Sequence, residues 1–197
     1  MSSNSIAKYF PFCRVKVINQ TVTQDADMAY IEIEPNERYK PVCHICGGTS
    51  TTIHNWETRD IRDLNFASAR TWLKYKYRKI YCRKCQKVVV ENLGICQPSA
   101  RITERLAKTI YELCKTMSIT DVAKHYSLNW KTVKNIDKYY LEREYEHTNY
   151  EDLRIIAVDE IAIKKGHNYM TVVLNYETGE VVWLDKERKA KTFYKYK

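Results

Sequence analysis

The sequence predicts a multidomain α+β fold, because three stretches of the chain differ in the periodicity of their apolar residues. Polarity alternates from one residue to the next over 13–22, 28–34 and 70–81, as in strands with one buried face. Apolar residues recur every three or four positions over 103–147, as in helices that bury one side. A strand-like pattern returns from Ile155 onward. We therefore predict three domains, with the bounds 1–96, 97–148 and 149–197.

The first predicted domain is rich in strands. Residues 13–22 and 28–34 are expected to form a hairpin, whose second strand ends at Pro35. Residues 70–81 are expected to form one long strand. Because side chains alternate between the two faces of a strand, the two faces differ in character. One face carries Leu73, Tyr75 and Tyr77, and the other carries Lys74, Lys76 and Arg78.

The charge balance predicts an anionic partner. The chain has 33 Lys and Arg residues against 24 Asp and Glu residues, a net charge of +9, which favours nucleic acid or an anionic membrane surface. Residues 62–87 contain nine cations and one acid, Asp63, a balance of +8. Such a run is either a nucleic-acid surface or a solvated strand face. The candidate phosphate contacts in it are Lys74, Lys76 and Arg78.

The sequence also indicates a compartment. No stretch approaches the roughly 20 consecutive apolar residues of a membrane span, and residues 1–12 lack the pattern of a signal peptide. We therefore expect a cytoplasmic protein with no membrane partner, where thiols stay reduced. Seven cysteines, an odd number, then favour metal binding over disulfide pairing.

Four of the cysteines form the strongest chemical pattern in the sequence. Cys43 and Cys46 lie in one Cys-x-x-Cys turn, and Cys82 and Cys85 lie in another. Two such turns supply the four thiolates of a tetrahedral structural Zn²⁺, which leave no open position for catalysis. The 35 residues between Cys46 and Cys82 are more than compact zinc modules have, and they predict an inserted β-hairpin.

The spacing of these cysteines is compatible with more than one role. The four residues are a zinc site or unmetallated core cysteines, and His54 is an alternative ligand. Four thiolates around Zn²⁺ have a net charge of about −2, which Lys40, Arg83 and Lys84 can offset. The single cysteines are expected in the core. They are Cys13, Cys96 and Cys114.

The second predicted domain has the pattern of a helix-turn-helix. Thr103 is expected to cap its first helix, Ser118 and Asp121 form a capping box for the second, and Asn129 caps the third. Ser127 stands at the turn, where glycine is common. The positions expected to pack between crossing helices are Val122, Ala123, Tyr126, Leu128, Val133 and Ile136.

The third of these helices is the candidate recognition helix. The alternative is an ordinary helical bundle with a solvated lysine face. As a recognition helix it would contact base edges and phosphates of double-stranded DNA. The candidate contacts are Trp130, Lys131, Thr132, Lys134, Asn135 and Lys138.

Taken together, these motifs resemble the N-terminal part of DDE-type bacterial insertion-sequence transposases of the ISL-three group. The resemblance runs from about Cys43 to the C-terminus. Besides the two cysteine turns and the helix-turn-helix, it rests on Arg59–Leu64, Ala157–Ile161, Lys164–His167 and Thr178–Trp183. It implies that the zinc-binding domain and the helix-turn-helix bind terminal inverted repeats of double-stranded DNA. It also implies that residues 149–197 supply the first three strands of an RNase H-like core that cuts and joins DNA.

The catalytic part of this resemblance is incomplete. Asp159 matches the first carboxylate of the family's DDE triad. Phosphoryl transfer by such a core needs several carboxylates around two divalent ions such as Mg²⁺, and the neighbouring Glu160 points to the opposite face of the strand. We therefore expect a truncated core that is inactive alone. The remaining acids, which match no triad position, are Glu177, Glu180, Asp185 and Glu187. The side chains expected to be partly exposed are Val158, Ile161, Val172, Val173 and Val182.

The leading hypothesis is zinc-dependent binding to transposon ends by a truncated transposase of a bacterial insertion sequence. Its expected partners are DNA and either a full-length transposase or a second copy of the chain. One alternative is a regulator that competes for transposase sites, and another is a zinc-stabilised interaction module. A third is that the chain is part of a complete enzyme whose remaining carboxylates lie elsewhere.

Overall fold

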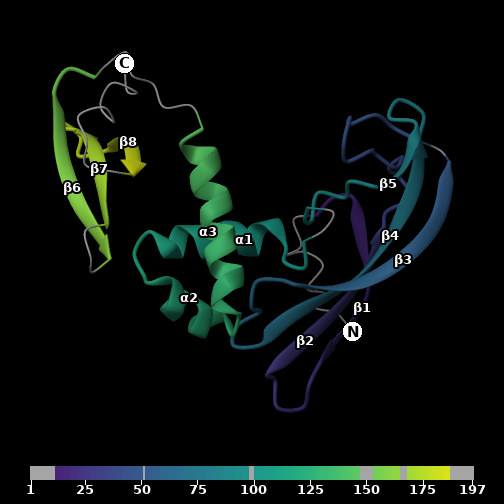
Figure 1. The fold of residues 1–197 in the computed structure, drawn as a ribbon. Helices are drawn as coiled ribbons and strands as arrows, with labels where there is room; N and C mark the ends of the chain where they lie inside the picture. The colour runs from purple at the N-terminus through teal and green to yellow at the C-terminus, as the bar shows by residue number, and fades with distance from the viewer. Residues whose placement is uncertain (1–11, 51, 98–99, 147–152, 165–167, 187–197) are drawn as a thin grey trace. The chain divides into compact units, whose positions relative to one another are not determined.

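The computed structural model describes residues 12–50, 52–97, 100–146, 153–164 and 168–186 (Figure 1). The chain divides into two compact units, Met1–Tyr140 and Leu141–Lys197. Within the described ranges, the first unit holds a five-stranded sheet and three helices, and the second holds a three-stranded sheet. The predicted α+β class is therefore confirmed. The predicted zinc-binding and helix-turn-helix domains lie together in the first unit.

The sheet of the first unit is mixed. Strands β1 and β2 form the predicted antiparallel hairpin, β2 pairs with β4 in parallel, and β4 pairs with β3 and β5 in antiparallel fashion. The order across the sheet is β1-β2-β4-β3, with β5 on β4. Strands β3 and β4 are the hairpin expected between the two cysteine turns. The bounds are β1 Val15–Val22, β2 Met28–Pro35, β3 Ile53–Arg62, β4 Arg70–Cys82 and β5 Lys87–Val90.

Strand β4 contributes to two hydrophobic cores on opposite faces of the sheet. In its first half, Leu73, Tyr75 and Tyr77 enter a core with side chains of β1, β2 and β3. In its second half, Ile80 and Cys82 point to the other face and enter a smaller core beside β5 and the first cysteine turn. The buried face of β4 therefore changes immediately after Tyr77.

The helical segment contains the helices α1, α2 and α3, and each predicted cap is present. The side-chain oxygens of Thr103, Ser118 and Asn129 accept hydrogen bonds from N–H groups in the first turns of α1, α2 and α3. Ser127 adopts the left-handed conformation with a φ of 53° at the turn between α2 and α3. The bounds are α1 Glu104–Cys114, α2 Ile119–Tyr126 and α3 Trp130–Glu144. The side chains fully buried between the helices are Leu106, Ile110, Val122 and Val133.

Two residues at the end of β3 join the helices to the sheet. The backbone of Arg62 pairs with the segment before α1, donating to the carbonyl of Arg101 at 2.8 Å and accepting from Thr103 at 2.9 Å. The buried carboxylate of Asp63 accepts hydrogen bonds from Thr103 Oγ1 at 2.7 Å and from both Nε and Nη2 of Arg105. The motif Arg59–Leu64 thus holds the helix-turn-helix against the sheet.

The second unit is an antiparallel meander of β6, β7 and β8 in that order. Val158 and Ile161 are exposed, as predicted. The prediction was wrong for Val172, Val173 and Val182, which are buried. The first two lie on β7, where neighbouring strands on both sides supply side chains that cover them. The bounds are β6 Ile156–Lys164, β7 Asn168–Asn175 and β8 Val181–Lys186.

That these strands begin an RNase H-like sheet stays a prediction. None of the helices in the described part of the chain is both long enough and apolar enough to cross a membrane.

Candidate metal centre and nucleic-acid interface

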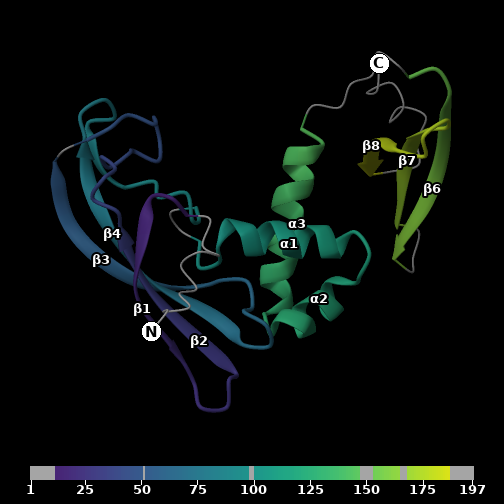
Figure 2. The ribbon, with the colours of Figure 1, turned by 180° about the vertical axis from the view of Figure 1, so that it is seen from behind.

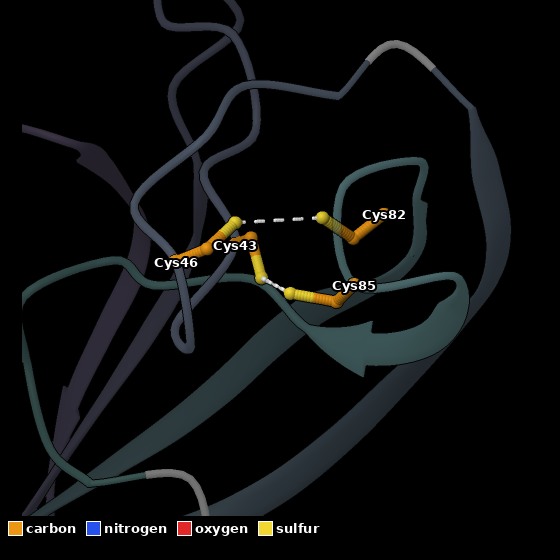
Figure 3. Close-up of side chains that lie close together, drawn as sticks. All are labelled: Cys43, Cys46, Cys82 and Cys85. Carbon is orange, nitrogen blue, oxygen red and sulfur yellow. Dashed lines mark hydrogen bonds between the residues drawn. The ribbon is translucent and has the colours of Figure 1, made fainter.

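The two cysteine turns face each other at one end of the sheet (Figure 3). The Sγ atoms of Cys43 and Cys85 lie 3.9 Å apart, and those of Cys46 and Cys82 lie 3.6 Å apart. All four sulfurs lie within 4.8 Å of one another. Tetrahedral Zn²⁺ with Zn–S bonds of about 2.3 Å requires sulfurs about 3.8 Å apart. The four side chains therefore fit the donor set and the spacing of a structural zinc site.

The backbone of both turns supports this arrangement. Gly47 and Gln86, each directly after the second cysteine of its turn, have left-handed φ angles of 70° and 52°, which fold the chain back past the sulfurs. The N–H of Ile45 points at Cys43 Sγ, 3.4 Å away. A hydrogen bond from the backbone N–H of Cys85 lowers the pKa of the Cys82 thiol to about 7. Such donors favour the thiolate form of Cys82, whereas the contact with the Cys46 sulfur raises the pKa of the Cys85 thiol.

The other cysteines and the nearby histidines lie apart from this cluster. His44 Nδ1 is 2.8 Å from the carbonyl oxygen of Val90, and His54 lies outside the four-cysteine group. Cys96 and Cys114 are partly buried, as expected. Cys13 is exposed, so its assignment to the core was wrong.

The lysines of β1 and β4 are ion-paired. The run of +8 in the sequence is offset by acids that neighbouring strands bring alongside β4. The hydrogen bond from Lys16 also holds the pKa of the Glu34 carboxyl below its ordinary value. Lys74 and Lys76 thus remain exposed candidates for phosphate contact, but each already has an acidic partner. One face has the pairs Lys74–Glu32 (3.2 Å), Lys76–Glu34 (3.7 Å) and Lys16–Glu34 (2.9 Å), and the other face has Lys79–Glu57 (2.5 Å).

Arg78 is not on the exposed face, and the sequence-based assignment of this residue to a DNA surface was wrong. Its guanidinium donates to both carboxylate oxygens of Glu91, with Nη2–Oε2 at 2.6 Å. The two side chains are only 7% and 0% exposed. The alternating pattern placed Arg78 on the same face of β4 as Lys74 and Lys76. From Arg78 onward, however, that face is buried by the smaller core beside β5 and the first cysteine turn.

Helix α3 presents most of its predicted contacts to solvent. Lys131, Lys134, Asn135 and Lys138 are exposed, and Thr132 is half-buried. Trp130 is exposed, with Lys131 Nζ 5.9 Å from the centre of its ring. The opposite side of the helix is anchored in the helical core through Val133 and Ile136.

A groove of about 570 Å³ lies along one flank of α3. Thr132 and Asn135 line it together with Gln97 and Arg101, which belong to the segment that leads into α1. These last two residues were not among the contacts predicted from the sequence. The available signal was a cation two residues before the α1 cap Thr103, but only the fold shows that this segment lies beside α3.

Asp159 lies exposed on β6, with its Oδ1 accepting from the N–H of Glu160 at 2.7 Å. Asp159 pairs with Val172 of β7. Glu160 pairs with Thr171 of β7, and Thr171 pairs on its other side with Asp185 of β8. Asp185 therefore shares a face with Glu160 and not with Asp159. In the described part of the chain, Asp159 belongs to no group of three or more metal-ligating side chains. Glu187 lies outside the described residues.

Comparison with known families agrees with this organisation. The zinc-finger model of transposase IS204/IS1001/IS1096/IS1165 matches residues 40–85. The model for the helix-turn-helix domain of transposase family ISL3 matches residues 91–141. The ISL3 transposase model matches residues 156–197. The fold and these matches thus define the class: a transposase with a zinc finger followed by a helix-turn-helix.

The chain belongs to the ISL3 family of transposases. It is 30% identical over 151 residues to the transposase for insertion sequence element IS1001 of Bordetella parapertussis, covering 77% of this chain and 37% of that relative. It is 27% identical over 126 residues to the transposase for element IS1557 of Mycobacterium tuberculosis, covering 64% of this chain and 28% of that relative. The matches thus span about a third of the length of these relatives. No solved structure matches the chain.

Proposed function

We propose that the chain binds double-stranded DNA at the ends of an insertion sequence, with α3 as the helix that reads the sequence. The observation that carries this proposal is the exposed polar face of α3, set on a fully buried helix-turn-helix core. The family match of residues 91–141 to a transposase helix-turn-helix supports it. In such domains the second helix of the motif lies in the major groove.

The chemistry of the exposed face suits this role. Asn135 has an amide that can bond in bidentate fashion to adenine, and such a pair contributes about 1–3 kcal/mol of discrimination. Lys131 and Lys134 flank it and can contact phosphates. Because Val133 is fully buried, rotation of α3 about its own axis would expose apolar surface. The fold thereby determines which residues of α3 are exposed and available for contact.

We further propose that Cys43, Cys46, Cys82 and Cys85 hold one Zn²⁺. The metal would join the β4–β5 turn to the segment before β3. That segment also contacts the residues after β5, through the bridge Cys43–Glu91 and the hydrogen bond from Asn92 N–H to the carbonyl of Val42. Because all four positions would be filled by thiolates, its role is structural, and its binding free energy contributes to folding.

Residues 156–197 match part of a transposase domain, and we propose Asp159 as one carboxylate of its catalytic site. Two-metal phosphoryl transfer requires further carboxylates around the ions, which would be Mg²⁺ in a complete core. We therefore propose that DNA binding is independent of Asp159. The relatives come from bacteria, and we place the activity in the bacterial cytoplasm, where the element's DNA lies.

Selection of bound duplexes from a random pool tests the proposal. We expect a consensus that forms the inverted ends of an element. Asn135→Ala should relax the consensus at one base pair, at a cost of about 1–3 kcal/mol for the preferred sequence. Asn19→Ala, on an exposed position of β1, is the matched control and should leave the consensus unchanged. Recovery of no consensus by the unaltered chain would contradict the proposal.

A further inference from the structure

Cations are distributed unevenly over the first unit. The lysines of β1 and β4 are paired with acids of neighbouring strands. Three cations beside the zinc site differ, because they are exposed and form no ion pair with the described acids. We call them the zinc-loop cations: Arg83, Lys84 and Lys87.

We propose that the zinc-loop cations are a second DNA contact, which holds the phosphate backbone about one helical turn from the site read by α3. This inference rests on the proposed function of α3. It assigns the phosphate contacts of the zinc-binding part to the tip of the sheet and not to the sheet face.

The first support is the lack of acids available to the zinc-loop cations. The two acids nearest along the neighbouring strands are already engaged, Glu57 by Lys79 and Glu91 by Arg78. Arg83 and Lys84 lie between the ligands Cys82 and Cys85, in a turn with defined backbone geometry. Phosphates would therefore contact cations that do not first have to release a protein carboxylate.

The second support is the length of β4. Thr71, near one end of this strand, hydrogen-bonds through its carbonyl to Arg62 and Asp63 at the junction with the helices. Cys82 ends the strand at the zinc site. Cys82 is 11 positions after Thr71, which corresponds to a length of about 35 Å along the strand. This length is close to the roughly 34–36 Å of one turn of DNA. Figure 2 shows β3 and β4 side by side as long strands that run from near the helices to the far end of the sheet.

The third support is the surface next to the cations. A groove of about 390 Å³ is lined by Lys87, His44, Ile45 and Val88, among others. Ile45 and Val88 are 51% and 41% exposed. Such an apolar floor beside a cation suits the sugar–phosphate backbone of one strand, because deoxyribose is largely apolar and its phosphate is anionic. We assign this groove to the DNA backbone.

The competing hypothesis is that Arg83 and Lys84 only offset the negative charge of the zinc thiolates. It is distinguished by measuring zinc content and the salt dependence of DNA binding on the same variants. The slope of log affinity against log salt is negative, and each lost phosphate contact reduces its magnitude by about 0.9. Charge compensation alone would change only the retention of zinc.

The experiment compares three forms of the full chain on a mixed-sequence duplex of about 30 base pairs, which spans about three helical turns. The test variant carries Arg83→Gln, Lys84→Gln and Lys87→Gln. The control carries Lys16→Gln and Lys115→Gln, at two exposed lysines that pair with Glu34 and Glu112 and have no proposed DNA contact. We expect the magnitude of the slope to fall by about 2 to 3 in the test variant and by less than about 0.5 in the control.

Shortening the duplex tests the spacing. On a duplex of about 8 base pairs, roughly 27 Å long, the unaltered chain cannot engage both sites at once, because the sites are about 35 Å apart. The magnitude of its salt slope should then fall to that of the test variant on the long duplex. The salt slope of the test variant itself should change little when the duplex is shortened. An unchanged slope in a test variant that retains one zinc per chain would overturn the inference.

Two further results keep the test decisive. Should the test variant lose zinc, Lys87→Gln and Lys87→Arg replace it, because Lys87 lies outside the Cys82–Cys85 turn. The slope should then fall by about 0.9 in the first and stay unchanged in the second, and equal slopes in both would overturn the inference. Weak, salt-insensitive binding by the unaltered chain would instead contradict the proposed function itself.

Discussion

Asp63→Asn should loosen the junction between the sheet and the helix-turn-helix. The Asp63 side chain is 0% exposed and receives hydrogen bonds from Thr103 Oγ1 and from two nitrogens of Arg105. Removing one partner of a buried ion pair typically costs about 3–5 kcal/mol. The asparagine oxygen can still accept from Thr103, and the Arg105 side chain is 27% exposed and can regain water. We therefore expect a loss of about 2–3 kcal/mol.

Urea unfolding followed by far-ultraviolet circular dichroism measures this loss. With a slope of about 1–3 kcal/mol per molar urea, the midpoint for the helices should fall by about 1 M. Asp60→Asn is the matched control, because Asp60 is an exposed acid on the same strand and such changes usually stay within about 0.5 kcal/mol.

A double-mutant cycle with Arg105→Gln isolates the pair itself. We expect a coupling energy of about 1–3 kcal/mol between the two positions, the range for residues in one hydrogen-bond network. A midpoint for Asp63→Asn equal to that of the Asp60→Asn control, together with no coupling to Arg105, would refute the assignment of this junction to the buried carboxylate.

Three other changes test separate parts of the structure. Cys43→Ser should abolish zinc binding and unfold the β4–β5 end of the sheet, because a structural zinc contributes its binding free energy to folding. Elemental analysis and circular dichroism measure these two effects, and full zinc occupancy in the variant would contradict the prediction. Leu106→Ala removes a fully buried side chain and should cost about 2–5 kcal/mol in urea unfolding, against less than about 0.5 kcal/mol for the exposed Lys108→Ala. Asp159→Asn should leave DNA affinity unchanged. Neither the unaltered chain nor this variant should nick DNA with Mg²⁺ present, since one carboxylate cannot hold two metal ions. Nicking by the unaltered chain that disappears in the variant would contradict this prediction.

The two cysteine turns and the helix caps depend on local spacing, and the sequence was sufficient to identify them. A Cys-x-x-Cys turn places two sulfurs together whatever the rest of the chain does. A cap at Thr103, Ser118 or Asn129 involves residues only two or three positions away. The helix-turn-helix follows from the same short-range pattern, because its apolar positions recur within a few residues of one another.

Charge was harder to predict, because its effect depends on neighbours that are distant in the chain. The run of +8 is offset in the fold by Glu32 and Glu34 of β2, by Glu57 of β3 and by Glu91 after β5. A count along the sequence cannot include these acids, since strand pairing and register bring them alongside β4. Only the fold therefore separates paired cations on the sheet face from the unpaired zinc-loop cations.

By itself, the sequence determined the helices with their caps, the two cysteines of each turn and the exposed polar face of α3, because each depends on residues at most a few positions apart. The meeting of the two cysteine turns, which are 35 residues apart in the chain, depends on the fold. The tertiary structure alone decided the burial of Arg78, the role of Asp63 at the junction and the parallel pairing of β2 with β4. These features depend on which strands become neighbours and in which register. That choice is made by the packing of the whole sheet, where a strand such as β4 can bury one face in its first half and the other in its second.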